Sequence, residues 1–153
     1  MPSWRYSVQN LDPDRTAIAS ARDLRVSPKA AREVCRFVRG MELEKAKKVL
    51  QEVIDLKRSV PFFRHDKKIP HRAGVQGYDA GRYPVKAAKE ILKLLNQVEA
   101  NAEFKGLYTN RLRIIHIATQ RARVIRDYFP RAFGRSSPFF EHLSHIEIAV
   151  EEF

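Results

Sequence analysis

The sequence predicts an α+β fold: a short strand, three helices and then a long antiparallel β-hairpin. Two segments repeat apolar residues every three or four positions, and a third lies between a Ser-Pro pair and a glycine, so these three segments predict helices. From residue 112 onward apolar and polar residues alternate, which is typical of strands. With 153 residues, 44% of them hydrophobic, the chain 1–153 has the size and composition of one folded domain.

The first third of the chain predicts an arm, a strand and two helices. Residues 1–15 are polar and irregular, and Thr16 to Asp23 could form a strand. Ser27-Pro28 predicts a helix start, with Ser as the N-cap and Pro at the first helical position, and Gly40 predicts its end. Apolar residues that step by three and four predict a second helix from Glu42 to Lys57.

The middle of the chain predicts a long basic loop and a third helix. Residues 59–83 contain prolines and three of the six glycines and show no apolar periodicity, so they predict a loop. A loop of about 25 residues inside a small domain is unusual and often functional. Pro84 then predicts the start of a helix that ends at Gly106, with a buried stripe of Ala88, Ile91, Leu92, Leu95, Val98 and Ala102.

The last third predicts a β-hairpin that extends from the domain. Alternation places Leu112, Ile114, His116 and Ala118 on one face, and Ile115 and Ile117 on the other. A turn-forming stretch lies between the strands, and a fold about Phe133-Gly134 would pair Ala118 with Ala149 and make 119–145 an extended hairpin with its tip near 130–136. Because a free two-stranded hairpin is marginal in water, and this one carries arginine on both faces, we expect an external anionic partner to order it.

The net charge of +11 comes from two segments. Residues 57–82 hold seven bases and two acids, residues 111–135 hold seven arginines and one acid, and the rest of the chain holds equal numbers of bases and acids. A third surface is a one-sign stripe along the first helix: Arg25, Lys29, Arg32, Arg36 and Arg39. Arginine grips phosphate bidentately and stacks on bases, so these surfaces predict a nucleic-acid partner rather than a merely solvated surface. Aromatic residues interleave with the bases, as base stacking would require: Phe62, Phe63, Phe129, Phe133, Phe139 and Phe140. Phe139 and Phe140 could equally pack on the sheet.

No motif predicts catalysis, a cofactor or a metal. The single Cys35 excludes an internal disulfide and a Cys-cluster zinc site, and we expect it to serve as a small buried hydrophobe. His142 and His145 lie three apart on a predicted strand, so their rings would face opposite sides, and His116 is expected to be packed or hydrogen-bonded. The chain has neither an apolar run of membrane-spanning length nor a signal-peptide pattern near its start, which predicts a cytosolic protein.

On the residues alone, two other functional classes stay open beside an RNA-binding structural protein. One is a DNA-binding or architectural protein that uses the hairpin as a groove-inserted ribbon, which comparable affinity for duplex DNA and structured RNA would favour. The other is a nuclease with a carboxylate-held metal, which magnesium-dependent cleavage would reveal.

Four motifs resemble one family. PRAFGR at Pro130–Arg135, followed after a gap by SHIEIAVEE at Ser144–Glu152, resembles the hairpin tip and return strand of the L-twenty-two family of large-subunit ribosomal proteins, called L-seventeen in eukaryotes. ARDLRVSPKAAREV at Ala21–Val34 resembles the family's first strand and helix, and VEANAE at Val98–Glu103 resembles the end of its long helix. The resemblance runs from Thr16 to the C-terminus. The long basic loop resembles that of the archaeal and eukaryotic members, whereas Phe133 stands where bacterial members often have a basic residue.

The resemblance implies three helices on a small three-stranded antiparallel sheet with a projecting hairpin. It implies a non-enzymatic protein that binds large-subunit rRNA, supports subunit assembly and lines the nascent-peptide exit tunnel. The implied partners are rRNA, neighbouring large-subunit proteins and the nascent polypeptide, with no membrane and no homo-oligomer. The tip in the tunnel would be Arg131, Ala132, Phe133, Gly134 and Arg135.

Together, the basic surfaces and the resemblance give one set of expected rRNA-binding residues: Arg22, Arg25, Lys29, Arg32, Arg36, Arg39, Lys57, Arg58, Arg64, Lys67, Lys68, Arg72, Arg82, Arg113, Arg121, Arg123, Arg126, Arg131 and Arg135.

Overall fold

A computed structural model describes residues 5–75 and 77–153; Met1 to Trp4 of the predicted arm and Gln76 of the basic loop lie outside the described residues. The elements follow the chain in the order β1 (Thr16–Leu24), α1 (Pro28–Val38), α2 (Leu43–Ile54), β2 (Val60–Pro61), β3 (Gly81–Arg82), α3 (Val85–Phe104), a short 3₁₀ helix η1 (Thr109–Arg111), β4 (Leu112–Ile125), β5 (Tyr128–Pro130), β6 (Ser136–Pro138) and β7 (Glu141–Glu152).

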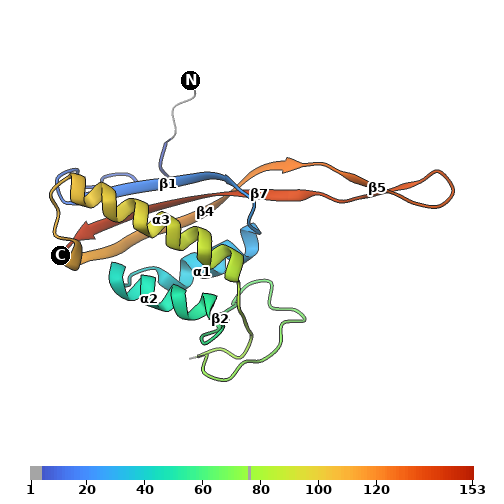
Figure 1. Ribbon diagram of the computed structural model, residues 1–153, viewed down its shortest axis with the longest axis horizontal. Coiled ribbons are helices and arrows are strands. Elements are labelled where there is room, and N and C mark those ends of the chain that lie inside the picture. Colours follow the sequence, from blue (N-terminus) through green and yellow to red (C-terminus); the bar gives the residue numbers. More distant parts are fainter. Residues whose placement is uncertain (1–4, 76) are drawn as a thin grey trace.

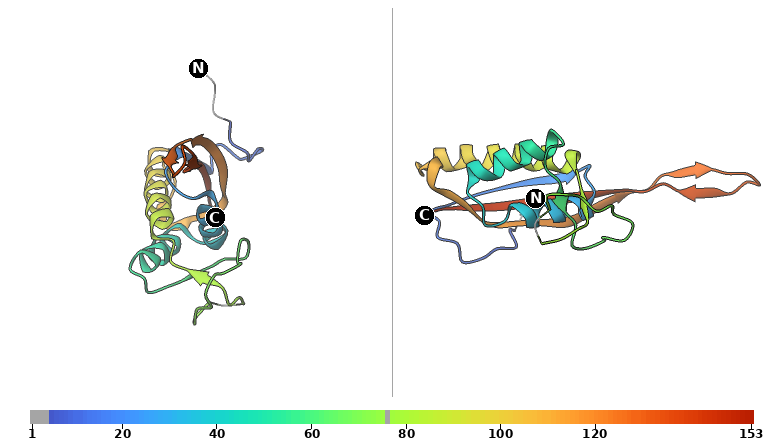
Figure 2. Two further views of the ribbon diagram at one scale, coloured as in Figure 1. Left: turned by 90° about the vertical axis from the view of Figure 1, so that its right-hand side faces the viewer. Right: turned by 90° about the horizontal axis from the view of Figure 1, so that it is seen from below.

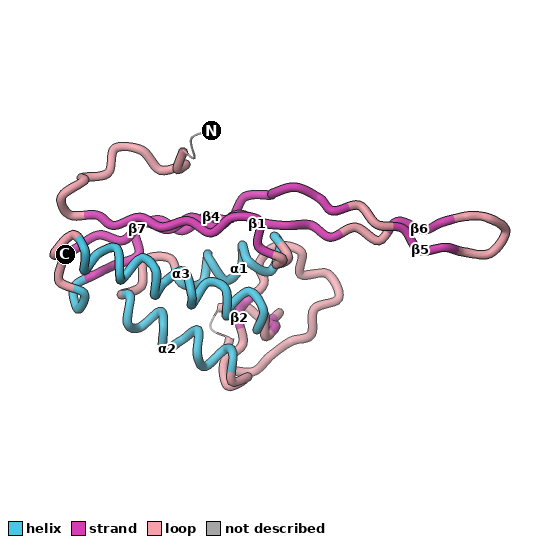
Figure 3. Tube along the Cα trace, turned by 45° about the horizontal axis from the view of Figure 1, so that its top comes forward, coloured by secondary structure: helices cyan, strands magenta, loops and turns pink. Residues whose placement is uncertain are grey.

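A three-stranded antiparallel sheet of order β1-β7-β4 forms the centre of the molecule, and the three α-helices lie on one of its faces (Figure 1). The N-terminal arm runs along the other face, as Figure 3 shows. The predicted α+β fold of three helices on a three-stranded antiparallel sheet with a projecting hairpin is confirmed.

The core lies between the sheet and α3. Ile91, Leu95 and Val98 of α3 are fully buried against Ile146 and Ile148 of β7 and their neighbours. The predicted stripe is buried except for Leu92, which is only partly buried, whereas Ala87 and Leu94 are buried although the stripe omits them. The buried face is wider than predicted because α3 contacts α2 as well as the sheet.

Glycine and a Schellman-type ending stop the helices. Gly40 follows α1 with φ +80° and donates its N–H to the carbonyl of Ile114, which ties the helix end to β4. Ser27 occupies the predicted N-cap position, but its side chain makes no capping hydrogen bond. The second helix stops three residues before the predicted Lys57, because Leu56 adopts φ +61° and the Lys57 N–H bonds back to Glu52.

A β-bulge in β4 reverses the predicted faces of that strand. Ile114 pairs with Val150 and His116 with Ala149, so Ile115 is an extra residue. Beyond the bulge Ile117 is buried under the helices, whereas His116 faces the arm. The prediction that His116 and Ala118 share a face with Leu112 and Ile114 is therefore wrong, and Ala118 pairs with Glu147 instead of the predicted Ala149.

The basic loop, 59–83, is mostly irregular, as predicted, but it has its own order. Strands β2 and β3 pair within it, and His71 forms a bridge to Ala80. Phe62 and Ile69 are buried in the main core. The loop is therefore a small lobe packed on the body rather than a free strand of chain.

Past the body, β4 and β7 continue as a two-stranded ribbon that ends in the β5–β6 hairpin (Figures 1 and 2). A second register shift lies between Arg121 and Val124, so strict alternation of side chains fails there. At the tip the Arg131 N–H donates to the carbonyl of Arg135, and Phe133 and Gly134 take φ +57° and +65°. The turn is thus centred on Phe133 itself, and not between Phe133 and Gly134 as predicted.

Candidate nucleic-acid interface

The structure places the expected rRNA-binding residues on the surface. Eighteen of the nineteen are exposed, and only Arg32 is half-buried. The fold therefore places this predicted set of basic residues at the surface of the protein.

The predicted stripe lies only partly on α1: Lys29, Arg32 and Arg36 are in the helix, Arg39 is its C-cap residue, and Arg25 precedes its N-cap. Arg36 and Arg39 are exposed while Ala31, Val34 and Val38 are buried. Because the helix repeats every 3.6 residues, the spacing of four and three keeps the cations on one side.

Glu33 is a buried acid beside this stripe that the sequence reading missed. It is 1% exposed, its Oε1 lies 2.9 Å from Nη1 of Arg32, and its Oε2 accepts the Phe63 N–H at 3.2 Å. Glu33 therefore compensates part of the charge of Arg32 and fastens the basic loop to α1. An acid among the apolar positions of a helix was the only sequence signal for it.

Arginine and aromatic side chains pair where the loop meets α1. The Arg36 guanidinium lies 4.2 Å from the ring centre of Phe63, which in turn contacts Tyr78 at 4.8 Å. Arg58 lies over Phe37 at 5.8 Å, and these side chains line a hollow of about 390 Å³. The stripe of α1 and the basic loop thus form one continuous surface, although the two segments lie apart in the sequence. Phe62, in contrast, is 4% exposed and is not free to stack on a base, which corrects that prediction.

The distal hairpin exposes both its arginines and its aromatic rings. Phe129 contacts Phe139 at 4.8 Å, and Tyr128 contacts Phe140 at 5.6 Å, each edge to face across the ribbon. All four rings are nevertheless at least 40% exposed. Phe139 and Phe140 therefore pack within the hairpin and not on the three-stranded sheet, and their outer surfaces stay open.

The hairpin cations have few internal partners. Arg123 lies 3.5 Å from Asp23 in an ion pair whose side chains are 73% and 41% exposed, and Arg131 donates to the Ser137 hydroxyl. Exposed pairs of this kind contribute little to stability and give way to a stronger anion. Arg113 lies apart from the hairpin, at the other end of β4, over the ring of Phe153 at 4.6 Å.

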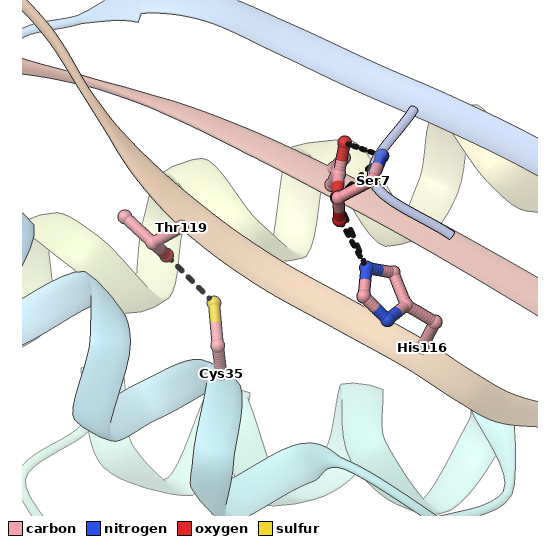
Figure 4. A network of polar contacts seen from close by, with 5 residues as sticks. Ser7, Cys35, His116 and Thr119 are labelled. Carbon is pink, nitrogen blue, oxygen red and sulfur yellow. Dashed lines mark hydrogen bonds and ion pairs between the residues drawn. The ribbon is translucent and has the colours of Figure 1, made fainter. Parts of the chain in front are cut away.

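A polar cluster of Ser7, His116 and Glu147 on the open face of the sheet anchors the arm (Figure 4). Glu147 accepts hydrogen bonds from the backbone and hydroxyl of Ser7, and Nε2 of His116 lies 3.0 Å from Oε1. Burial acts to raise the pKa of Glu147, but the hydrogen bonds from Ser7, His116 and Gln120 outweigh it and hold that pKa below 4.5.

This cluster contains the residue types of a hydrolase triad without its geometry. The same nitrogen of His116 faces both Ser7, at 3.2 Å, and Glu147. In a triad the carboxylate binds the other ring nitrogen and leaves this one for the serine. The cluster therefore holds the arm on the sheet, and His116 is hydrogen-bonded as predicted.

Cys35 is a structural side chain, as expected. It is 3% exposed on α1, and its sulfur lies 3.1 Å from the Thr119 hydroxyl, beneath the sheet in Figure 4. Burial raises the pKa of its thiol to about 12, so the reactive thiolate is absent at neutral pH. Within residues 5–75 and 77–153 no three His, Cys, Asp or Glu side chains are grouped to hold a metal. The helices of the same residues include none long and apolar enough to cross a bilayer.

A globular α+β body that carries an exposed, arginine-rich two-stranded ribbon defines the structural class of this chain. The comparisons identify the family within this class. Residues 19–151 match the family model described as "Ribosomal protein L22p/L17e". Three full-length relatives, each named "Large ribosomal subunit protein uL22", come from Methanopyrus kandleri (55% identical; 97% of this chain and 96% of the relative), Thermofilum pendens (51%; 99% of both) and Methanocaldococcus jannaschii (49%; 100% and 97%).

The chain belongs to the ribosomal protein L22p/L17e family. The resemblance drawn from its motifs is confirmed, and so is the archaeal type, since these relatives are archaeal. As a member of a family of ribosomal proteins, the chain is a structural component and not an enzyme, as the sequence predicted.

Proposed function

We propose that this chain is a structural constituent of the large ribosomal subunit in the cytoplasm. It binds rRNA by neutralising backbone phosphates, supports subunit assembly and places its hairpin tip in the wall of the nascent-peptide exit tunnel. Full-length relatives at about half identity that are named for the large subunit support the first part. The exposed, arginine-rich hairpin that extends from the body supports the rRNA contacts and the position in the tunnel.

The observation that carries the proposal is the distal hairpin. From Arg123 to His142 every described residue except Ser137 is exposed, although the segment includes five large aromatic residues. A two-stranded ribbon without a third layer cannot bury a face by itself. Stacking rings and bidentate cations are the groups that unpaired bases and phosphates satisfy, so RNA around both faces would supply the missing layer.

The tip supports the tunnel assignment. Arg131 to Arg135 form the end of the hairpin farthest from the body (Figure 1), and Phe133 is 92% exposed there. A narrow ribbon can reach the interior of a particle that the body cannot enter. At that depth its partners are rRNA, the neighbouring large-subunit proteins and the emerging polypeptide.

Sedimentation of a gentle native lysate on a sucrose gradient tests the subunit assignment. We expect the protein to migrate with the large subunit and to remain there through a moderate salt wash. Recovery in light fractions or on chromosomal DNA would contradict the proposal and favour the architectural DNA-binding class. With purified components, affinity for rRNA should fall about 10³–10⁵-fold between 50 and 200 mM salt if roughly 6–10 phosphates are contacted, and a flat response would exclude the phosphate-contact mechanism.

Excision of the hairpin tests its role separately from folding. Leu143 and Ser144 are buried, so a deletion of 119–145 would cut into the core. Replacement of residues 123–142 by Asn-Gly instead joins Ala122 to Leu143 through a two-residue turn. We expect this variant to retain the unfolding transition of the body but to be absent from assembled large subunits. Loss of the body's cooperative unfolding would show that the hairpin is part of the fold, and normal incorporation would show that it is dispensable for assembly.

A further inference from the structure

A groove of about 640 Å³ lies at the root of the hairpin, where four parts of the chain meet. Its walls come from the connection between β1 and α1, the first turns of α1 and α3, and the facing strands β4 and β7. Its charged lining residues are Arg25, Lys29, Lys86, Arg121 and Glu141.

The groove keeps a net positive charge. Four cations line it, and the only acid among its described lining residues is Glu141. Glu141 lies 3.5 Å from Arg25, but both side chains are exposed, at 47% and 70%. An exposed pair of this kind is a weak competitor for Arg25. A concave surface lined by one sign of charge also focuses its field into the opening, which a flat stripe of cations does not.

The floor of the groove is fixed by the body. Val26 and Leu143 are each 3% exposed, and the Ser144 hydroxyl donates to the carbonyl of Val26 at 3.1 Å. Arg121 pairs with Ser144 immediately before the register shift of the hairpin. The groove is therefore formed before any partner binds, in contrast to the exposed ribbon beyond it.

On the basis of the proposed rRNA binding, we propose that this groove holds a sharply turned segment of RNA backbone, with two or three phosphates bound by its four cations together. Phosphates that a turn brings close repel one another, and cations that converge from separate chain segments into one concavity are the arrangement that offsets this repulsion. The backbone of a straight duplex follows a convex surface and reaches at most the rim of such a groove. Arg25 and Arg121 can each grip a phosphate bidentately, while the lysines act as point charges.

Lys86 and the grouping of the four cations in one groove were not part of the predicted interface. Lys86 lies outside the predicted basic loop, on the first turn of α3. The sequence pattern does not group it with other cations. Arg25 and Lys29 belong to the predicted stripe of the first helix and Arg121 to the segment 111–135, and only the fold brings these two surfaces and Lys86 together in one site.

The test compares matched charge-removing variants of the full chain in equilibrium binding to refolded, protein-free large-subunit rRNA from the source cells. The groove variants are Lys86→Gln and Arg121→Gln. Their controls are Lys89→Gln, exposed one turn further along α3, and Lys48→Gln, exposed on α2 outside the predicted basic surfaces. We expect each groove variant to lose roughly fivefold in affinity and to reduce the slope of log K against log salt by about 0.7–0.9, while the controls stay within about twofold of the parent chain.

A straight RNA duplex of about 20 base pairs is the second probe. The double variant Lys86→Gln/Arg121→Gln should bind rRNA more than about tenfold less tightly and should bind the duplex as the parent chain does. Equal losses in groove and control variants, or equal losses on rRNA and duplex, would overturn the groove while leaving rRNA binding intact. Binding of the parent chain to a duplex DNA of the same length is measured in parallel, and failure to prefer rRNA over that DNA would overturn the proposed function itself. All four positions are exposed, and an unchanged thermal unfolding curve verifies the fold of each variant.

Discussion

The two halves of the long strands β4 and β7 have similar residue types and opposite environments. In the body, Ile114, Ile146 and Ile148 are fully buried because α3 and its neighbours cover one face of the sheet. In the hairpin, Val124 and Ile125 are 39% and 38% exposed, because nothing in the described chain covers them. An apolar strand residue thus shows that a covering layer is needed, but it does not show whether the same chain provides that layer.

The body and the hairpin also differ in their balance of charges. Outside residues 57–82 and 111–135 the bases and acids are equal in number, and some of them pair directly, as Glu33 does with Arg32 and Lys47 with Glu99. Between Arg121 and Arg135 a single acid, Asp127, stands against five arginines. Apolar exposure and uncompensated positive charge coincide there, so a covering layer that is both stacking and anionic would match both properties of the hairpin.

The largest expected difference in the free energy of unfolding is between the alanine variants of an isoleucine in the body and of one in the hairpin. Ile148→Ala removes a fully buried side chain from the central strand and should lower the free energy of unfolding by about 2–5 kcal/mol. Ile125→Ala makes the same chemical change in the hairpin and should alter it by no more than about 0.5 kcal/mol. Urea denaturation of both variants measures the difference, and similar losses would show that the hairpin packs into the free protein.

A smaller loss of stability is expected when the carboxylate of Glu147, which anchors the arm, is replaced. The folded state holds the pKa of Glu147 below its unfolded value of 4.5, so this group stabilises the protein above pH 4.5 and loses that contribution as the pH falls through the folded pKa. Glu147→Gln should therefore cost about 1.5–3 kcal/mol at pH 7 and progressively less toward pH 3.

Unfolding measured across this pH range tests the prediction, with the exposed Glu103→Gln as the matched control. A loss that is independent of pH would mean that the packing of Glu147, and not its charge, holds the arm.

Local signals in the sequence predict the elements well. Pro28 and Gly40 mark the ends of α1, and Pro84 and Gly106 mark those of α3, because backbone geometry at these positions is a property of the residue itself. The end of α2 was missed because Leu56 takes the left-handed conformation that glycine normally supplies.

The sequence did not predict the features that depend on how the elements pack against one another. The bulge at Ile115 inserts one residue into a regular alternation, and nothing in the apolar pattern shows where the strands must shift to stay paired. Leu94 is buried because α2 lies beside α3, which the periodicity of α3 alone does not reveal. Likewise, the basic residues were found from composition, whereas Lys86 gains its surroundings only when the ends of two helices and the hairpin root converge.

The smallest effect on stability should come from the tip. Phe133 is 92% exposed and holds φ +57°, a conformation that costs a residue with a side chain about 1 kcal/mol. Phe133→Gly removes this local cost, yet the free energy of unfolding of the body should change by less than about 0.5 kcal/mol, because the tip can fray without disturbing a buried contact. Gly134→Ala is the matched opposite change: its φ is +65° and no atom lies within 4 Å of an added Cβ, so it alters only backbone preference. Amide hydrogen exchange should register both substitutions in the turn between Arg131 and Arg135, in opposite directions, and urea denaturation of the body should register neither. A shift of the whole unfolding curve by either variant would mean that tip and body fold as one cooperative unit, and the division between a self-sufficient body and a partner-dependent hairpin would fail.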